Sequence, residues 1–73
     1  MTDVAAIVRG LSEAQRRALA MARRDQIDKL PRIYGHAGVT RKALRERGLA
    51  HGDPCYLTPL GDAVRTALME EGR

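Results

Sequence analysis

Two histidines and one cysteine are the side chains of this sequence best suited to binding a metal ion. They are His36, His51 and Cys55, and Asp53 lies close to the last two. No pair has the C-x-x-C or H-x-x-x-H spacing that brings ligands together around zinc. The sequence therefore predicts no metal site and no cofactor, and we interpret these residues as two surface histidines and a half-buried thiol.

The hydroxyl groups and the glycines give no catalytic pattern. Ser12 and Thr58 stand where helix N-caps are expected, and capping accounts for both of them. The glycine-containing stretch 35–38 is shorter than a phosphate-binding loop and lacks the lysine that follows such a loop. Because an active site needs several convergent groups, we expect no catalytic residues and no enzymatic activity.

Lysine and arginine point most clearly to a ligand, because they gather in one part of the chain. Residues 9–51 hold eleven of them against four acidic residues, a net charge of +7 (11 − 4). Residues 52–73 hold two basic and four acidic residues, a net charge of −2 (2 − 4). A basic region of this kind suits a polyanion such as nucleic acid, although basic faces are also common on soluble proteins.

A helix over residues 39–47 would place three of these basic side chains on one face. Arg41, Lys42 and Arg45 fall together on a helical wheel and are expected to project outwards. The residues of the opposite side, which is expected to pack on the rest of the domain, are Thr40, Ala43, Leu44 and Arg47.

The segment after this helix predicts a short hairpin. A glycine C-cap is expected to end the helix, followed by an apolar contact. Residues 50–57 then contain two short β-capable runs around the turn signal at 51–54. Alternation along the second strand would put Cys55 and Leu57 on one face and Tyr56 on the other.

Two helices are expected in the first third of the chain. The first runs from about Asp3 to Arg9, with Thr2 as its cap. The second begins at a capping box formed by residues 12–15 and continues through Arg24. Its expected buried stripe consists of Ala14, Ala18, Met21 and Ala22, with Leu19 at the edge. The arginines expected to face solvent are Arg16, Arg17, Arg23 and Arg24.

Residues 25–38 favour no single structure. They could extend the second helix or begin a short third one, and Pro31 would end either run.

The last helix begins at Thr58 and Pro59, a good N-cap followed by a good first helical residue. Its apolar stripe consists of Leu60, Ala63, Val64, Ala67 and Leu68, and the opposite side carries Asp62, Arg65 and Met69.

The length of 73 residues allows one domain, residues 1–73, near the lower limit for folding alone. Its fold class is expected to be mainly α with a small β-hairpin and three to four helices.

The single cysteine excludes an internal disulfide and suggests the reducing cytoplasm. No apolar run approaches the roughly 18 residues of a membrane span. The acidic Asp3 is unlike the start of a signal peptide, so we expect a cytoplasmic protein with no membrane partner.

Three segments together resemble a known group of proteins. They are LSEAQRRAL at 11–19, TRKALRERGLA at 40–50 and YLTPLG at 56–61. In this order and spacing they are similar to the small winged helix-turn-helix domains, which include MarR-like regulators and the short versions common in actinobacteria and their phages. The resemblance covers somewhat under half of the chain.

This resemblance implies a winged helix-turn-helix fold and binding to double-stranded DNA. The helix over residues 40–47 would enter the major groove as the recognition helix. A small transcriptional regulator of this type would bind as a homodimer to a two-fold site. The residues expected to contact DNA are Thr40, Arg41, Lys42 and Arg45 on this helix, Arg16 and Arg17 on the neighbouring helix, and His51 in the wing.

Another interpretation remains open, because winged helices also serve as protein-interaction modules. Asp53 at the tip of the expected wing would repel phosphate, and no supporting helix can be recognised directly before Val39. The acidic last helix points the same way. The alternative is a protein-binding domain, for example a phage protein that modulates a host factor, and a weaker one is a structural component of an assembly.

Overall fold

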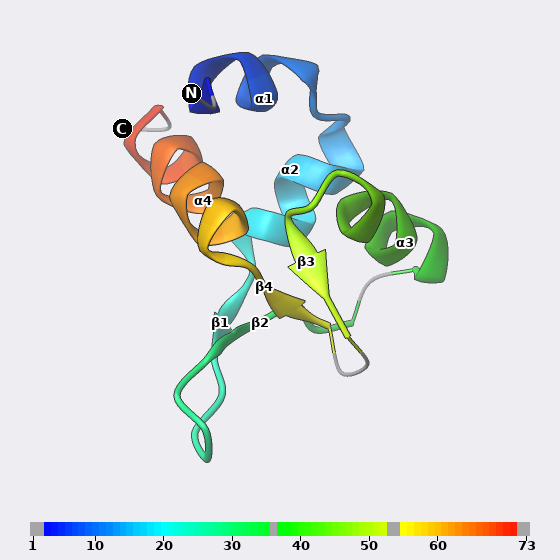
Figure 1. Cartoon of the computed structure of the whole chain (residues 1–73), viewed down its shortest axis with the longest axis vertical. Coiled ribbons are helices and arrows are strands. Elements are labelled where there is room, and N and C mark those ends of the chain that lie inside the picture. The colour runs from blue at the N-terminus through cyan, green and yellow to red at the C-terminus, as the bar shows by residue number, and fades with distance from the viewer. Residues whose placement is uncertain (1–2, 36, 53–54, 72–73) are drawn as a thin grey trace.

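The computed structural model describes residues 3–35, 37–52 and 55–71 and has an α+β architecture (Figure 1). Its helices are α1 (Val4–Gly10), α2 (Glu13–Ala20), α3 (Gly38–Glu46) and α4 (Pro59–Glu71). Its strands, each of two residues, are β1 (Arg23–Arg24), β2 (Pro31–Arg32), β3 (Ala50–His51) and β4 (Tyr56–Leu57). The predicted helices and the predicted hairpin at residues 50–57 are confirmed, but the sheet has two further strands.

Side-chain caps begin the first two helices. The Oδ1 atom of Asp3 accepts a hydrogen bond from the Ala6 amide at 3.1 Å, so Asp3 is the cap of α1. The sequence predicted Thr2 for this role, and Thr2 lies outside the described residues. The capping box of α2 is confirmed: Ser12 Oγ accepts from the Gln15 amide at 3.2 Å, and Gln15 Oε1 accepts from the Ser12 amide at 3.0 Å.

Helix α2 is shorter than predicted, because it ends at Ala20 and not at Arg24. The two arginines that would have closed the helix instead form β1, where Arg23 pairs with Arg32 in antiparallel register. The expected buried stripe is therefore partly wrong. Met21 is 61% exposed, since the helical wheel no longer applies beyond the end of α2. Ala14 is exposed as well, and the buried residues are Ala18, Leu19 and Ala22.

Residues 25–30, which could have been helical, form the loop of a hairpin between β1 and β2. The Asp25 amide donates to the Leu30 carbonyl at 2.9 Å, and the Lys29 amide donates to the Asp25 carbonyl at 3.0 Å. Asp25 Oδ1 also accepts from the Ile27 amide at 2.8 Å. Such local bonds from an aspartate favour a turn over a helix.

The sheet is antiparallel throughout and has the strand order β1-β2-β4-β3. The C-terminal hairpin pairs Ala50 with Leu57 and His51 with Tyr56. Alternation along this second strand is as predicted, since Cys55 and Leu57 are buried and Tyr56 is half-buried. The two ends of the sheet differ, because β3 lies beside α3 whereas the β1–β2 hairpin projects away from the helices (Figure 1).

The core lies between the helices and one face of the sheet. Its fully buried centre consists of Leu19, Leu44, Leu49 and Val64, one from each of α2, α3, the segment before β3, and α4. Helix α1 packs on α4, and α2 packs on both α3 and α4 (Figure 1). Within the described residues no helix is both long enough and apolar enough to cross a membrane.

A glycine-based cap ends α3, as the sequence predicted. Gly48 has φ +76°, and its amide donates to the Arg45 carbonyl at 3.0 Å. The Leu49 amide donates to the Leu44 carbonyl at 3.0 Å, and both leucine side chains are fully buried. These two bonds form a Schellman motif with its apolar contact, which fixes the direction of the chain after α3.

Helix α4 begins at the predicted cap and contacts this turn directly. Thr58 Oγ1 accepts from the Gly61 amide at 3.0 Å and donates to the Gly48 carbonyl at 2.7 Å. Three residues of α4 differ from the prediction: Ala63 is exposed, and Asp62 and Arg65 are half-buried. The Arg65 Nε donates to the Ala22 carbonyl at 3.1 Å, so this arginine joins α4 to the end of the α2 segment instead of facing water.

Candidate nucleic-acid interface

Helix α3 is held rigidly on the domain by its buried side. Leu44 is fully buried, and the Schellman motif fixes the C-terminal end of the helix. Arg47, the C-cap residue, adds a long-range contact, because its guanidinium donates to the Gly10 carbonyl at 3.1 Å. The outer side of α3 is thus presented to solvent in a fixed orientation.

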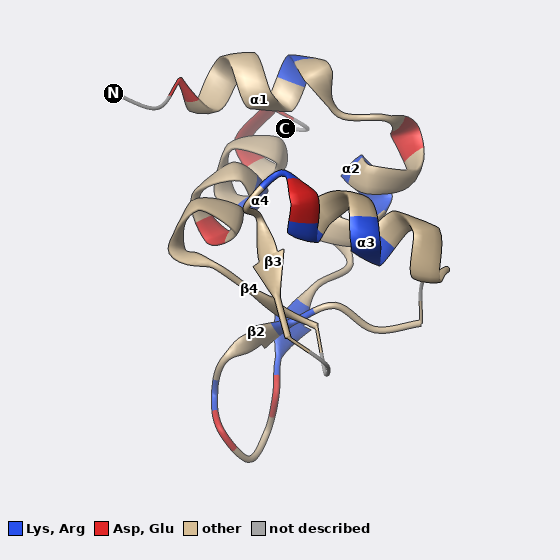
Figure 2. Ribbon diagram, turned by 45° about the vertical axis from the view of Figure 1, so that its right-hand side comes forward, with Lys and Arg blue, Asp and Glu red and all other residues tan. Residues whose placement is uncertain are grey.

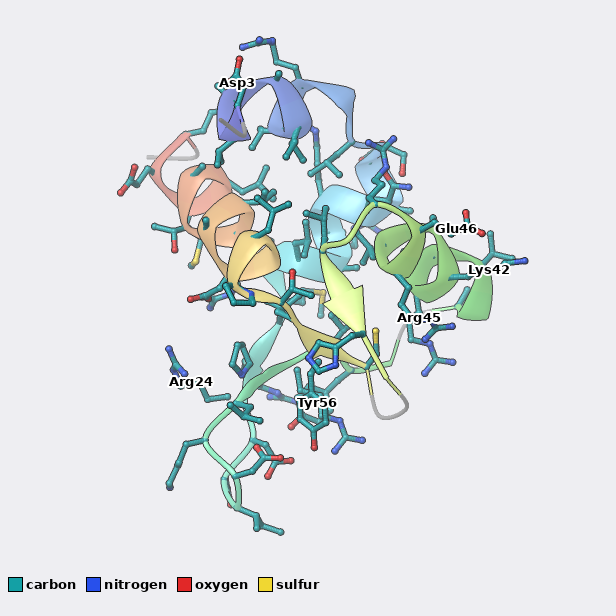
Figure 3. All side chains as sticks on the ribbon, viewed as in Figure 1. Asp3, Arg24, Lys42, Arg45, Glu46 and Tyr56 are labelled. Carbon is teal, nitrogen blue, oxygen red and sulfur yellow. The ribbon has the colours of Figure 1, made fainter. Side chains whose placement is uncertain are left out.

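Two of the three expected basic side chains of α3 project from this outer side. Lys42 and Arg45 are exposed and point away from the core (Figure 3). Arg45 also reaches the C-terminal hairpin, where its guanidinium donates to the Gly52 carbonyl at 3.5 Å. Lys42 and Arg45, three residues apart, lie on one side of α3, and Arg45 connects this side to Gly52. We call this surface the α3 face.

Arg41 does not project as freely as predicted. It is half-buried, and its Nε atom is shielded from solvent with no hydrogen-bond partner among the described residues. The cause is its position on the wheel, since Arg41 lies one turn before the fully buried Leu44 and so sits at the border of the packed side. Thr40 is half-buried for the same reason.

The two arginines expected on α2 have different environments. Arg16 is half-buried and its guanidinium donates to the Val8 carbonyl at 2.8 Å, so it connects α2 to α1. Arg17 is accessible and pairs with Glu13 at 3.6 Å, with side-chain exposures of 66% and 89%. Such an exposed pair contributes little to stability and leaves Arg17 free to exchange partners. Of the two predicted phosphate contacts, Arg17 is the accessible one.

His51 lies on β3, the strand beside α3, and is exposed. Its ring lies near that of Tyr56 on the paired strand, with ring centroids 6.1 Å apart. Because β3 contacts α3 and Arg45 bonds to Gly52, His51 belongs to the border of the α3 face.

Arg23 and Arg24 are exposed, as predicted, but they lie on the β1–β2 hairpin beside Arg32 and not on the second helix. The guanidinium carbons of Arg23 and Arg32 each lie 5.0 Å from the centroid of the Tyr34 ring, within cation–π range. Figure 2 shows basic positions at the base of this hairpin as well as on α2 and α3. The sequence does contain a signal for this hairpin. Asp25 favours a turn, two arginines precede it, and Pro31 and Arg32 follow it.

The acidic residues of this hairpin are engaged within it. Backbone donation from Ile27 is the main cause that lowers the pKa of Asp25, and donation from the Tyr34 hydroxyl at 3.3 Å and the charge of Arg32 act in the same direction. Donation of the Tyr56 hydroxyl to Asp28 at 2.7 Å raises the pKa of Tyr56. The ionised form of the Asp25 carboxylate is therefore stabilised by its contacts within this hairpin.

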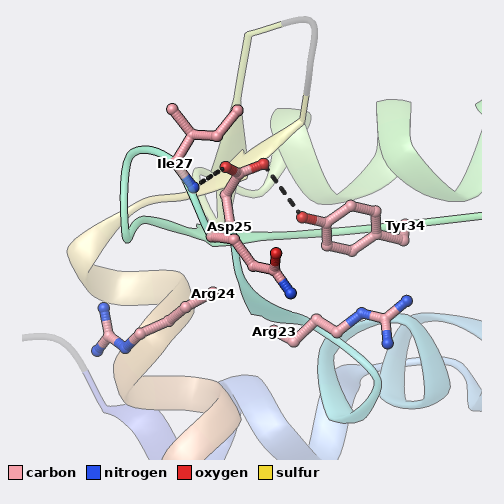
Figure 4. Close-up of a pocket in the computed structure, with 6 residues that line it drawn as sticks. Arg23, Arg24, Asp25, Ile27 and Tyr34 are labelled. Atoms are coloured by element: carbon pink, nitrogen blue, oxygen red, sulfur yellow. Dashed lines mark hydrogen bonds between the residues drawn. The ribbon is translucent and has the colours of Figure 1, made fainter.

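An open hollow of about 450 Å³ lies beside this hairpin, lined by residues that include Arg23, Arg24, Asp25 and Tyr34 (Figure 4). Among residues 3–35, 37–52 and 55–71, no group of three histidine, cysteine or acidic side chains could hold a metal ion. His36 and Asp53, two of the four candidate ligands, lie outside these residues, so the absence of a metal site stays a prediction.

The two basic groups, the α3 face and the β1–β2 hairpin, are thus the features that the structure offers for recognition. Comparison of the chain with known protein families, with characterised proteins and with solved structures finds no match.

Proposed function

We propose that this protein binds double-stranded DNA through the α3 face. The observation that carries the proposal is the fixed presentation of Lys42 and Arg45 on a helix whose opposite side is fully buried at Leu44. A short helix displayed in this way fits the major groove, where lysine and arginine reach guanine edges or phosphates. The charge of this half of the chain complements the DNA backbone.

The arrangement of α2, α3 and the β3–β4 hairpin supports a winged-helix mode of binding. Helix α2 packs on α3, and α3 leads directly into the hairpin. The difference from a simple helix-turn-helix is the segment 21–37, which contains the β1–β2 hairpin between the two helices. In this mode the β3–β4 hairpin lies along the DNA backbone beside the groove that α3 occupies.

The position of each exposed residue of the interface indicates which part of the DNA it contacts. Arg45 and Lys42 contact base edges or phosphates in the groove, and Arg17 on α2 contacts a neighbouring phosphate. His51 and the half-buried Thr40 and Arg41 border this contact. A single α3 offers few base contacts, so the protein acts as a homodimer on a two-fold DNA site, as a small cytoplasmic transcription regulator.

Titration of random duplex DNA at two salt concentrations tests the proposal. We expect binding that weakens as salt rises, with a dissociation constant of about 10⁻⁴ to 10⁻⁶ M for non-specific DNA at physiological salt. Arg45→Ala is expected to cost about 1–3 kcal/mol where Arg45 reads a base. Lys42→Ala should lower the salt slope by about one where Lys42 contacts a phosphate. Arg9→Ala, which removes an exposed arginine of α1, is the matched control and should leave the affinity unchanged.

A protein partner is the second candidate, and two exposed apolar side chains favour it. Val39 is 81% exposed and Met21 is 61% exposed, and association with another protein would bury apolar side chains of this kind. The same titration separates the two functions. If the protein does not bind duplex DNA at low salt, or binds equally well after Lys42→Ala and Arg45→Ala, the DNA proposal is wrong and the protein partner takes its place.

A further inference from the structure

The β1–β2 hairpin forms an arm that extends beyond the rest of the domain (Figure 1). Its loop, residues 25–30, carries an isoleucine at the tip, and Ile27 is 92% exposed, more than any other large apolar residue among those described. Leu30, on the returning side of the loop, is 50% exposed. An isoleucine so exposed contributes nothing to the core, so packing does not explain why an apolar residue lies at the tip of this loop.

Hydrogen bonds inside the loop make this arm stiff. Asp25 Oδ1 accepts from the Ile27 amide at 2.8 Å, directly beneath the exposed side chain (Figure 4). Asp28 Oδ1 accepts from the Leu30 amide at 3.0 Å, and the Arg24 guanidinium donates to the Lys29 carbonyl at 2.9 Å. These hydrogen bonds therefore hold the loop together at more than one position along the arm.

A second set of bonds fixes the arm to the sheet. The Tyr56 hydroxyl of β4 donates to Asp28 Oδ2 at 2.7 Å, which joins residues far apart in the sequence. At the base, Asp25 Oδ2 accepts from the Arg32 guanidinium at 3.4 Å and from the Tyr34 hydroxyl at 3.3 Å. Ile27 is thus held at the end of a braced projection.

The arm carries a net positive charge. Residues 23–32 carry four basic and two acidic side chains, a net charge of +2 (4 − 2). Both carboxylates accept hydrogen bonds within the arm, as described above, whereas Arg23 and Arg24 leave their strand in opposite directions (Figure 4). Positive charge on two sides of a narrow arm suits a groove with a row of phosphates on each wall.

The surroundings of Ile27 argue against a protein as its main partner. Its neighbours along the loop are Gln26, Asp28 and Lys29, all polar and exposed. A specific protein interface buries about 800 Å² on each partner around an apolar centre, and Ile27 with the 50% exposed Leu30 does not provide an apolar centre of that size. An apolar side chain that projects from an arm with basic residues at its base matches the wedges that proteins insert between base steps in the minor groove.

We propose that the β1–β2 arm is a second DNA-contacting element, which places the Ile27 side chain in the minor groove of the duplex. This proposal rests on the DNA binding proposed above and adds a separate contact to it. Ile27 partly unstacks one base step, while the basic residues of the arm contact phosphates on the two sides of the groove. Binding through the arm therefore bends the DNA.

The test uses the intact protein and a random-sequence duplex that contains 2-aminopurine, a base whose fluorescence rises when it is unstacked. Affinity is measured by anisotropy and bending by energy transfer between dyes at the duplex ends. We compare the wild type with Ile27→Ser, Ile27→Leu and, as a matched control at another exposed apolar residue, Met69→Ser. Met69 is 48% exposed on α4.

We expect Ile27→Ser to weaken binding roughly tenfold, the effect of losing one buried apolar side chain, and to abolish the fluorescence rise and the bend. Ile27→Leu and Met69→Ser should behave like the wild type. Because Ile27 is outside the core, the melting temperature of the free protein should be the same for all variants, so a loss of binding cannot be attributed to unfolding.

Three results would overturn the proposal, and they differ from one another. If the wild type binds duplex DNA and Ile27→Ser binds and bends it equally well, the arm makes no contact although the function of α3 stands. If the wild type does not bind DNA at low salt, the proposed function fails and the arm contact fails with it. If sedimentation shows that Ile27→Ser dissociates a wild-type dimer, the arm is an interface between two copies of the chain.

Discussion

At the scale of single residues, the glycine at the start of α4 shows how closely this small domain is packed. A methyl group added at Gly61 would overlap the backbone carbonyl of Leu49. Neither backbone can withdraw easily, because Thr58 bonds to both the Gly48 carbonyl and the Gly61 amide. The close contact therefore joins the cap of α3 to the first turn of α4, and it requires a residue without a side chain.

Replacing this glycine should destabilise the protein. Gly61→Ala is expected to lower the free energy of unfolding by about 1–3 kcal/mol, the usual cost of forcing an extra carbon into a packed site. The measurement is urea denaturation followed by circular dichroism. Gly38→Ala is the control, because a methyl group at this first residue of α3 would meet no atom within 4 Å. Equal stability of the two variants would show that α4 does not approach Leu49 so closely.

At the scale of elements, the sequence predicts helices and their caps better than it predicts the arm. Ser12 with Gln15, Gly48 with Leu49, and Thr58 before a proline are local signals, and the structure confirms each of them. The arm depends on Asp25, whose bonds to Tyr34 and Arg32 come from seven to nine residues away. Strong helix formers before it concealed the end of α2, since propensity is a weak guide where tertiary contacts decide.

The sequence also predicts the candidate interface only in part. The wheel identified Lys42 and Arg45 correctly, because one buried leucine fixes the rotation of a short helix. It could not show that Arg16 bonds to the Val8 carbonyl or that Arg41 lies at the border of the packed side. Contacts between elements decide whether an arginine is available, and they do not appear in a single helical pattern.

The order of the arm should depend on pH through Asp25. Its pKa is lowered in the folded arm, chiefly by the Ile27 amide, so the stabilisation is complete above the ordinary value of 3.8. It is lost as the pH falls below 3.8 and through the lowered folded pKa. We expect the Ile27 amide resonance in NMR spectra to stay constant from pH 7 to about pH 4 and then to move towards the position of a disordered chain.

Asp25→Asn is the control for this titration. The amide oxygen of asparagine still accepts from the Ile27 backbone, so the turn should persist, but nothing at this position can take up a proton in the acid range. The Ile27 resonance of this variant should therefore be independent of pH between 5 and 3 within the precision of such shifts. An Ile27 resonance that titrates identically in both proteins would show that another carboxyl group controls the arm.

At the scale of the whole molecule, the core is small and every helix depends on it. The fully buried side chains are few, and Leu44 carries the link from α3 to the rest of the domain. A chain of 73 residues has a free energy of unfolding of about 4–11 kcal/mol at the usual value per residue. The position of the α3 face and the survival of the fold are consequently determined by the same contacts.

Removal of the Leu44 side chain should therefore affect the domain as a whole and not α3 alone. Leu44→Ala is expected to cost about 2–5 kcal/mol, because the cavity cannot be filled by the neighbouring fully buried residues. Such a loss is a large part of the total, so thermal unfolding should begin near room temperature and remain a single cooperative transition. Leu30→Ala removes the same atoms from the arm, where the side chain is 50% exposed, and should change the melting temperature little. If both variants melt alike, or if Leu44→Ala loses only the signal of α3, the core is not the shared support of the four helices and the α3 face would be free to move independently.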